Sequence, residues 1–354
     1  MIPTQRVPEV LHRARELVTP ALRAAVDRLS PELRPLAAYH LGWVDARGEP
    51  VGGDGGKGVR QALAVLSAEA VGAHGSVGTP GAVAVELVHN FSLIHDDVID
   101  EDAERRHRPT VWALFGIGRA VIVGDALLAL AQQVVLRPEA LQPGEPVVAT
   151  PPAAGPDGAR AARCIADATA AMIAGQALDM AFESVPGVDV AGCLAMEAGK
   201  TGALLGCAAA IGAVLAGAED ATVAALDTYG MELGLAFQEV DDLLGIWGDP
   251  LTTGKPAWSD LRQHKKTLPV AAALAAGGGA AEELAVILAA EHLEEVQIAR
   301  AAHLVEACGG RSAALDEADR RLASALAALD RTDLVPSAAA ELADVARFVV
   351  ERDF

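Results

Sequence analysis

The chain has 354 residues, of which 52% are hydrophobic and 21% are charged. This composition is too apolar for a disordered chain, and the length suffices for a large buried core. The 48 acidic residues outnumber the 28 basic ones and leave a formal net charge of −20. Such a surface repels phosphate backbones, so we expect no nucleic-acid partner.

The sequence predicts helices along most of its length. Aromatic residues make up only 3% of the chain, and no segment keeps the alternation of a half-buried strand. In chain order, the predicted helices span residues 5–29, 57–74, 80–106, 110–136, 157–184, 189–217, 219–247, 267–276, 280–309, 311–329 and 335–352. We therefore predict one all-α domain over residues 1–354.

Three stretches interrupt the helical pattern. Residues 44–56 are rich in glycine, and residues 248–266 form a long polar segment of the kind that often binds ligands. Residues 137–157 are rich in proline, which predicts a flexible insertion.

The sequence favours a cytoplasmic protein that is not integral to a membrane. The N-terminus carries charges where a signal peptide has its apolar stretch, and the 4 cysteines include no CxxC pair. Residues 201–218 lack charge and reach the lower limit for a spanning helix. Alanine and glycine dominate them, so we expect a tightly packed buried helix instead.

Lysine is rare in this chain and stands in distinctive places. The five lysines are Lys57, Lys200, Lys255, Lys265 and Lys266. Several lie in Gly-rich segments such as GGKG and TGKP, where the backbone can approach a ligand closely. An ammonium group acts as a point charge toward phosphate oxygen. We interpret the lysines as phosphate ligands, and chance retention on the surface is the alternative.

The first acidic cluster lies in LVHNFSLIHDDVIDED, residues 87–102. Helical spacing places His89, Asp96 and Asp100 on one face of a largely apolar helix. Like charges four residues apart destabilise a helix, and a divalent cation would remove that cost. Mg²⁺ suits such carboxylates when substrate phosphates and water complete its octahedron.

The second acidic cluster lies in MELGLAFQEVDDLLGIWGD, residues 231–249. Gln238, Asp241 and Asp242 share a helix face within an apolar run. A solvated acidic face is the alternative for either cluster alone, but basic segments follow both of them. Two carboxylate clusters with nearby cations are typical of a magnesium-dependent diphosphate site.

These segments resemble the trans-isoprenyl diphosphate synthases, the polyprenyl synthetase family. The similar segments, between about residues 55 and 270, are GGKGVR, HDDVIDEDAERRHRPT, GQALD, KTGALL, FQEVDDLLGIWGD and GKPAWSDLRQHKKTLP. The resemblance implies an all-α, single-domain helical bundle around a central apolar cavity. It also implies a homodimer.

The resemblance implies three Mg²⁺ ions bound with diphosphate. Asp96 and Asp100 would hold two ions on the allylic diphosphate, with Asp97 supporting them. Asp241 would hold a third ion, with Asp242 beside it as a further metal-binding residue.

The remaining ligands divide between two diphosphates. Those implied for the allylic diphosphate are Arg105, Lys200, Thr201, Gln238, Lys255 and Lys265. Those implied for isopentenyl diphosphate are Lys57, Arg60, His89 and Arg106. The chain departs from the family at Gly245, where the second motif usually has an aspartate. The third ion would then depend mainly on Asp241, and we expect Gly245→Asp to be tolerated.

The implied reaction condenses isopentenyl diphosphate with allylic diphosphates such as dimethylallyl, geranyl or farnesyl diphosphate. Phe91 and Ser92, shortly before Asp96, resemble the pattern of geranylgeranyl diphosphate synthases, which predicts a C20 product. Phe91 as an ordinary core residue is the alternative. Other functions to weigh are a farnesyl diphosphate synthase, a terpene cyclase on the same fold, a non-catalytic subunit of a heteromeric synthase and a phosphohydrolase.

Overall fold

The computed structural model describes residues 8–52, 58–137, 156–183, 185, 187–250, 257–290 and 292–350. Lys57, Lys255 and most of the predicted insertion at 137–157 lie outside the described residues. The all-α prediction is confirmed. Within these ranges the only strands are the two-residue β1 (Glu104–Arg105) and β2 (Arg108–Pro109), which pair as an antiparallel hairpin.

The chain groups into two compact units, each assembled from separate stretches. Unit 1 comprises Met1–Thr169, Cys207–Asp227 and Arg331–Val345. Unit 2 comprises Ala170–Gly206, Thr228–Asp330 and Ala346–Phe354. One domain over residues 1–354 stays a prediction.

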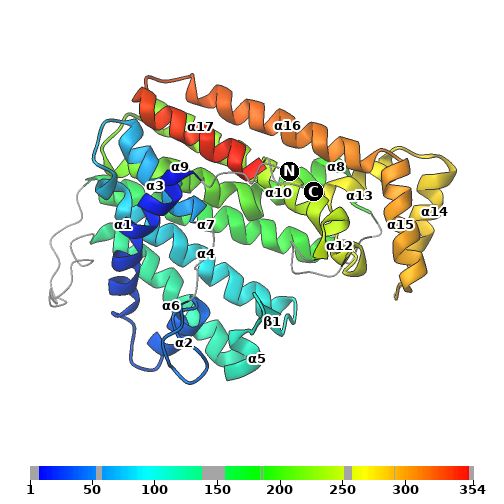
Figure 1. The fold of residues 1–354 in the computed structure, drawn as a ribbon, viewed down its shortest axis with the longest axis horizontal. Coiled ribbons are helices and arrows are strands. Elements are labelled where there is room, and N and C mark those ends of the chain that lie inside the picture. The colour runs from blue at the N-terminus through cyan, green and yellow to red at the C-terminus, as the bar shows by residue number, and fades with distance from the viewer. Residues whose placement is uncertain are drawn as a thin grey trace, which may run out of the picture. The chain divides into compact units, whose positions relative to one another are not determined.

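Unit 1 is built around a central helix that carries the first acidic motif. Its elements are α1 (Glu9–Val26), α2 (Arg34–His40), α3 (Val59–Ala70), η1 (Gly75–Gly78), α4 (Thr79–Ile99), the β1–β2 hairpin, α5 (Val111–Phe115) and α6 (Ile117–Leu136). Helix α4 packs along α6 and also contacts α1 and α3 (Figure 1). Helices α4 and α6 approach closely at Gly124, where a Cβ atom would lie only 2.3 Å from Nε2 of His95. This packing places the end of α4 beside the hairpin that follows it.

Unit 2 contains the second acidic motif, which lies on α10. Helices α7 (Pro156–Glu183), α9 (Ala203–Leu215), α10 (Asp220–Trp247) and α17 (Pro336–Val350) contribute residues to both units. The elements wholly in unit 2 are α8 (Val190–Glu197), the π-helical turn η3 (Ala198–Gly202), α12 (Ser259–Arg262), α13 (Leu268–Ala275), α14 (Gly278–Leu288), α15 (Glu295–Ala307) and α16 (Gly310–Leu329). An apolar cluster that includes Ile246, Leu284, Ile298 and Val305 joins α10 to α14 and α15.

Three predicted helices are shorter than the sequence pattern indicates. The helix predicted to residue 106 ends at Ile99, because Arg106 and His107 adopt positive φ angles of 53° and 59° in the hairpin turn. The helix predicted at 110–136 breaks at Gly116, where φ is 91°. The helix predicted at 280–309 divides into α14 and α15. Helix α2 was not predicted at all.

Two helices in the described ranges are long and apolar enough to span a membrane. In Val190–Leu215, 72% of an apolar stretch of 18 residues is buried, as expected for a core helix. In Ile117–Leu136 only 44% is buried, so α6 presents apolar side chains on its surface.

Candidate active site

The first acidic motif lies at the carboxyl end of α4. Asp96 is in the last turn and Asp100 caps the helix, with the backbone N–H of Asp100 donating to the carbonyl of Asp96 at 2.8 Å. The carboxyl end of a helix carries a partial negative charge, so acidic side chains there are unfavourable. Asp96 is half-buried and Asp100 is exposed. A divalent cation would stabilise this gathering of negative charge, which fits the predicted metal ligands.

Asp97 lies in the same motif but has a different environment. It is 1% exposed, and its Oδ1 accepts a hydrogen bond from Nε of Arg105 at 2.6 Å. Its Oδ2 is buried and has no hydrogen-bond partner among the described residues. Burial raises the pKa of Asp97, and the charge of Arg105 opposes that rise. Asp97 therefore joins α4 to the hairpin.

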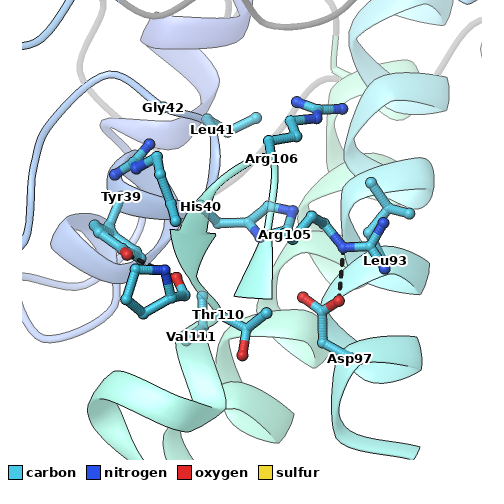
Figure 2. A pocket seen from close by; sticks show the side chains of 12 residues that line it. Tyr39, His40, Leu41, Gly42, Leu93, Asp97, Arg105, Arg106, Thr110 and Val111 are labelled. Atoms are coloured by element: carbon cyan, nitrogen blue, oxygen red, sulfur yellow. Dashed lines mark hydrogen bonds and ion pairs between the residues drawn. The ribbon is translucent and has the colours of Figure 1, made fainter. Parts of the chain in front are cut away.

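The hairpin and α2 enclose a cavity of about 200 Å³. Figure 2 shows His40, Arg105 and Arg106 around this cavity, with Asp97 at one side. Arg108 also lines it, and its guanidinium lies over the ring of Tyr39 at 4.4 Å. The hydroxyl of Tyr39 donates to the carbonyl of Pro109 at 2.7 Å, which ties α2 to β2. Three arginines around one cavity suit an anionic ligand.

The structure brings Arg60, His89 and Arg106 into one electrostatic neighbourhood. Burial lowers the pKa of His89 well below its ordinary value, and the charges of Arg60 and Arg106 lower it further. Burial and the charges of Arg105 and Arg106 likewise lower the pKa of His40 to about 3. Both imidazoles are therefore neutral near pH 7 before a ligand binds, and the positive charge comes from the arginines. His40 was missed because it lies far upstream of every motif.

Lys200 lies in the π-helical turn η3, a local geometry that is frequent at functional sites. Its Nζ pairs with Oδ2 of Asp179 on α7 at 2.5 Å. The α7 backbone touches this turn, since a Cβ atom on Gly175 would lie 2.2 Å from the amide nitrogen of Lys200. The GQALD segment thus supplies both the close approach and the acidic partner.

Thr201, Gln238 and Asp242 form one hydrogen-bonded chain. The hydroxyl of Thr201 donates to Oε1 of Gln238 at 2.8 Å, and Nε2 of Gln238 donates to Oδ1 of Asp242 at 2.8 Å. The backbone N–H of Leu268 donates to the other oxygen of Asp242 at 3.3 Å. Asp242 is only 4% exposed, whereas Asp241 is exposed. The two adjacent aspartates therefore have different surroundings, and Asp241 is the more accessible metal ligand.

Asp242 belongs to a buried group of three acids that includes Glu197 and Glu239. One carboxylate oxygen from each residue lies within 4.8 Å of the others. Burial raises the pKa of all three side chains, that of Glu239 to about 8, and mutual repulsion adds to the rise. We did not single out the two glutamates from the sequence. The only available signal was a lone glutamate inside each apolar run, CLAMEAG and LAFQEV.

The space beside Gly245 is filled by the carboxyl group of Asp260. A Cβ atom on Gly245 would lie 2.0 Å from Oδ2 of Asp260, which is 6% exposed. The hydroxyl of Ser259 donates to the carbonyl of Gly245 at 3.1 Å and holds α12 against α10. The expectation that Gly245→Asp is tolerated stays a prediction, and this contact argues against it, because a second carboxylate would meet the first unless Asp260 moved.

The predicted chain-length residues lie on α4 within unit 1. Phe91 is 6% exposed and its ring meets that of His95 edge to face, with 4.7 Å between centroids. Ser92 is half-buried, and its hydroxyl donates to the carbonyl of His89 at 2.9 Å. Lys265, the last predicted phosphate ligand, is exposed just after α12.

Comparisons with known proteins agree with these features. Residues 43–305 match the profile of the family described as polyprenyl synthetase. The chain is 47% identical over 353 residues to the (2E,6E)-farnesyl diphosphate synthase of Mycobacterium tuberculosis, covering 99% of this chain and 94% of that protein. It is 44% identical over 288 residues to the geranylgeranyl diphosphate synthase of the same organism, covering 81% and 78%. A crystal structure of polyprenyl synthetase from Streptomyces coelicolor A3(2) superposes with a TM-score of 0.90 at 52% identity, covering 98% of this chain and all of that one.

The contact between Gly245 and Asp260 predicts a compensating pair of substitutions. Gly245→Asp should lower stability by about 2 kcal/mol, because overpacking and like charge act together. Adding Asp260→Ala should recover most of that loss, because it vacates the occupied space. Urea unfolding of the two single variants and the double variant measures this coupling. Additive effects would contradict the contact.

Proposed function

Because the chain belongs to the polyprenyl synthetase family and is a trans-prenyl diphosphate synthase, we propose that it extends allylic diphosphates with isopentenyl diphosphate to geranylgeranyl diphosphate, C20. The allylic substrates would be dimethylallyl, geranyl and farnesyl diphosphate. The observation that supports this chemistry is the gathering of Asp96 and Asp100 at a negative helix end, beside an arginine-lined cavity. The non-catalytic, cyclase and phosphohydrolase alternatives lose support, because the matched relatives are prenyl diphosphate synthases.

The family is Mg²⁺-dependent, and the carboxylates present fit hard oxygen-seeking cations. Asp96 and Asp100 would hold two ions, and Asp241, with Asp242 beside it, would hold a third. Bound ions would stabilise the negative charge that develops on the departing diphosphate. Asp97 would act by orienting Arg105 through their ion pair.

The basic residues would divide between the two substrates. The proposed ligands of the allylic diphosphate are Arg105, Lys200, Thr201, Gln238, Lys255 and Lys265. The proposed ligands of isopentenyl diphosphate are Lys57, Arg60, His89 and Arg106. A neutral His89 can donate one N–H to a phosphate oxygen without adding charge. The apolar side chains of the helices would exclude water from the allylic cation.

A C15 product is the second candidate. The 47% identity to a farnesyl diphosphate synthase favours it, whereas the buried Phe91 with the smaller Ser92 beside it supports C20. Phe91 would form the floor of the chain-length pocket, because bulk at this depth limits the tail that can be accommodated.

We also propose a cytoplasmic homodimer that is not integral to a membrane. Leu114 on α5 and Ile117, Val121 and Ile122 on α6 are 40%, 56%, 38% and 57% exposed. Ile117 and Val121 share one side of α6 because they are four residues apart, and Ile122 extends this exposed apolar surface by about 100° around the helix axis. A contiguous exposed apolar surface of this kind usually marks an interface, and self-association through a twofold axis is the commonest form.

Removing a metal ligand of the first motif should abolish most activity without unfolding the protein. Asp96→Asn or Asp100→Asn should lower kcat by roughly 10²- to 10³-fold, as loss of a key electrostatic group does. Incorporation of labelled isopentenyl diphosphate measures it. Glu101→Gln removes a neighbouring exposed acid and should leave activity nearly normal. Near-normal activity in either aspartate variant would refute the metal assignment.

Changing the proposed pocket floor should change product length. Phe91→Ala should shift products beyond C20, because the vacated volume admits another five-carbon unit, and Ser92→Phe should shift them toward C15. Chromatography of the dephosphorylated alcohols reports the distribution. Leu127→Ala, a fully buried site on α6, should lower stability without altering length. A wild-type enzyme that stops at C15 would favour the second candidate.

Charging the exposed face of α6 should separate the dimer. Ile117→Glu with Ile122→Glu should produce a folded monomer, because burying two carboxylates in an apolar interface is costly. Sedimentation velocity gives the mass. The matched control is Val286→Glu with Val296→Glu, at unit 2 positions that are 75% and 78% exposed. If that control dissociates and the α6 variant does not, the interface lies elsewhere.

A further inference from the structure

A group of three buried acids inside unit 2 includes two glutamates that have no part in the proposed chemistry of either diphosphate. Glu197 ends α8, and Glu239 and Asp242 lie one turn apart on α10. Glu197, Glu239 and Asp242 are 2%, 0% and 4% exposed, and one carboxylate oxygen of each lies within 4.8 Å of the others. Three potential negative charges therefore share a small volume from which water is excluded.

The hydrogen bonds available to this group satisfy only one of its members. Asp242 accepts from Nε2 of Gln238 and from the backbone N–H of Leu268. Both carboxylate oxygens of Glu197 and both of Glu239 are buried, and outside this group of acids neither side chain has a hydrogen-bond partner among the described residues. Burying an unpaired carboxylate is costly, so these two side chains point to a ligand that the protein groups do not supply.

The arginine whose charge reaches this group is already paired with other acids. Arg321 on α16 pairs with Oε1 of Glu317 at 2.8 Å and with Oε2 of Glu232 at 3.0 Å. Its charge reaches Glu197 and Glu239 only as a weaker influence that opposes the rise of their pKa values. One arginine shared among four glutamates cannot neutralise the buried group.

A cation with oxygen ligands meets all of these requirements. The oxygens of opposite ligands around Mg²⁺ or Mn²⁺ are about 4.2 Å apart and those around Ca²⁺ about 4.8 Å, because metal–oxygen distances are about 2.1 and 2.4 Å. Only two of three ligands can lie opposite each other, and adjacent ligands are closer together. The mutual separations of no more than 4.8 Å in the buried group are therefore compatible with three ligands of one such ion. We propose that Glu197, Glu239 and Asp242 form a site for a hard divalent cation inside unit 2. The buried Asp242 would serve this ion, whereas the exposed Asp241 would serve the ion held on diphosphate.

The site would position the phosphate-binding turn without touching substrate. Glu197 immediately precedes η3, which carries Lys200 and Thr201, and Glu239 follows Gln238 on α10. An ion bound to both glutamates would fix η3 against α10. The hydrogen bond between Thr201 and Gln238 joins the same two segments, so the ion would reinforce an existing contact.

The proposal is tested by metal binding in the absence of any diphosphate. Metal-free protein is titrated with Mn²⁺ at pH 8, with bound ion counted by electron paramagnetic resonance and thermal stability followed in parallel. We expect one tightly bound Mn²⁺ per chain and a Tm increase of about 4 °C at a hundredfold excess over Kd. Parallel titrations with Mg²⁺ and Ca²⁺ show which ion the site prefers.

Matched variants assign the bound ion to this site. Glu197→Gln and Glu239→Gln should each weaken Mn²⁺ binding at least tenfold and remove the Tm increase. Their metal-free forms should be as stable as the wild type or more so, because a glutamine amide can donate to the remaining carboxylate. That comparison shows that they fold. Asp96→Asn with Asp100→Asn should keep the ion.

Three results would overturn the proposal. The first is that the metal-free wild type does not bind Mn²⁺. Protons would then neutralise the buried carboxylates in place of a metal ion. The second is unchanged binding in both glutamine variants. The third is loss of the ion only in the Asp96→Asn, Asp100→Asn protein.

Discussion

The ion pair between Asp97 and Arg105 joins the two features that carry the chemistry proposed for unit 1. One partner lies in the last turn of α4 and the other lies on the hairpin that follows it. The pair fixes Arg105, which lines the cavity, beside the helix end that carries Asp96 and Asp100. Because Asp97 is almost fully buried, breaking the pair would leave a buried charge without a partner, which is strongly destabilising. The acid in the middle of the motif is therefore structural, whereas the acids on either side are accessible.

Unit 2 uses acidic residues in a different way. Exposed Asp241 can meet a ligand from solvent, while Asp242, one residue later, extends a hydrogen-bonded chain that begins at Thr201. Two successive aspartates on a helix are separated by about 100° around its axis, so one can be accessible while the other is buried. Unit 1 differs in that the buried carboxylate of Asp97 has an arginine partner.

Helical spacing and charge were enough to predict the fold class and the two acidic segments. The β1–β2 hairpin was missed because Arg106 and His107 adopt positive φ without glycine, and no sequence rule places these residues there. His40, Asp179 and Asp260 were missed for another reason. Each reaches its site from a distant segment through packing, and periodicity describes only one element at a time. Lys57 and Lys255, which the sequence did single out, lie outside the described residues.

The contact between Gly245 and Asp260 bears on how departures from a motif are scored. An alignment compares positions along the chain, and by that measure this protein has lost one acid from its second motif. In space, a carboxyl group still stands next to position 245, but it belongs to α12 instead of α10. A substitution that an alignment scores as a lost acid can therefore mean that another helix provides the carboxyl group. A count of motif residues then underestimates the number of acids near the site. When a protein lacks one residue of such a motif, its function is better judged from the side chain that occupies the space of the missing one.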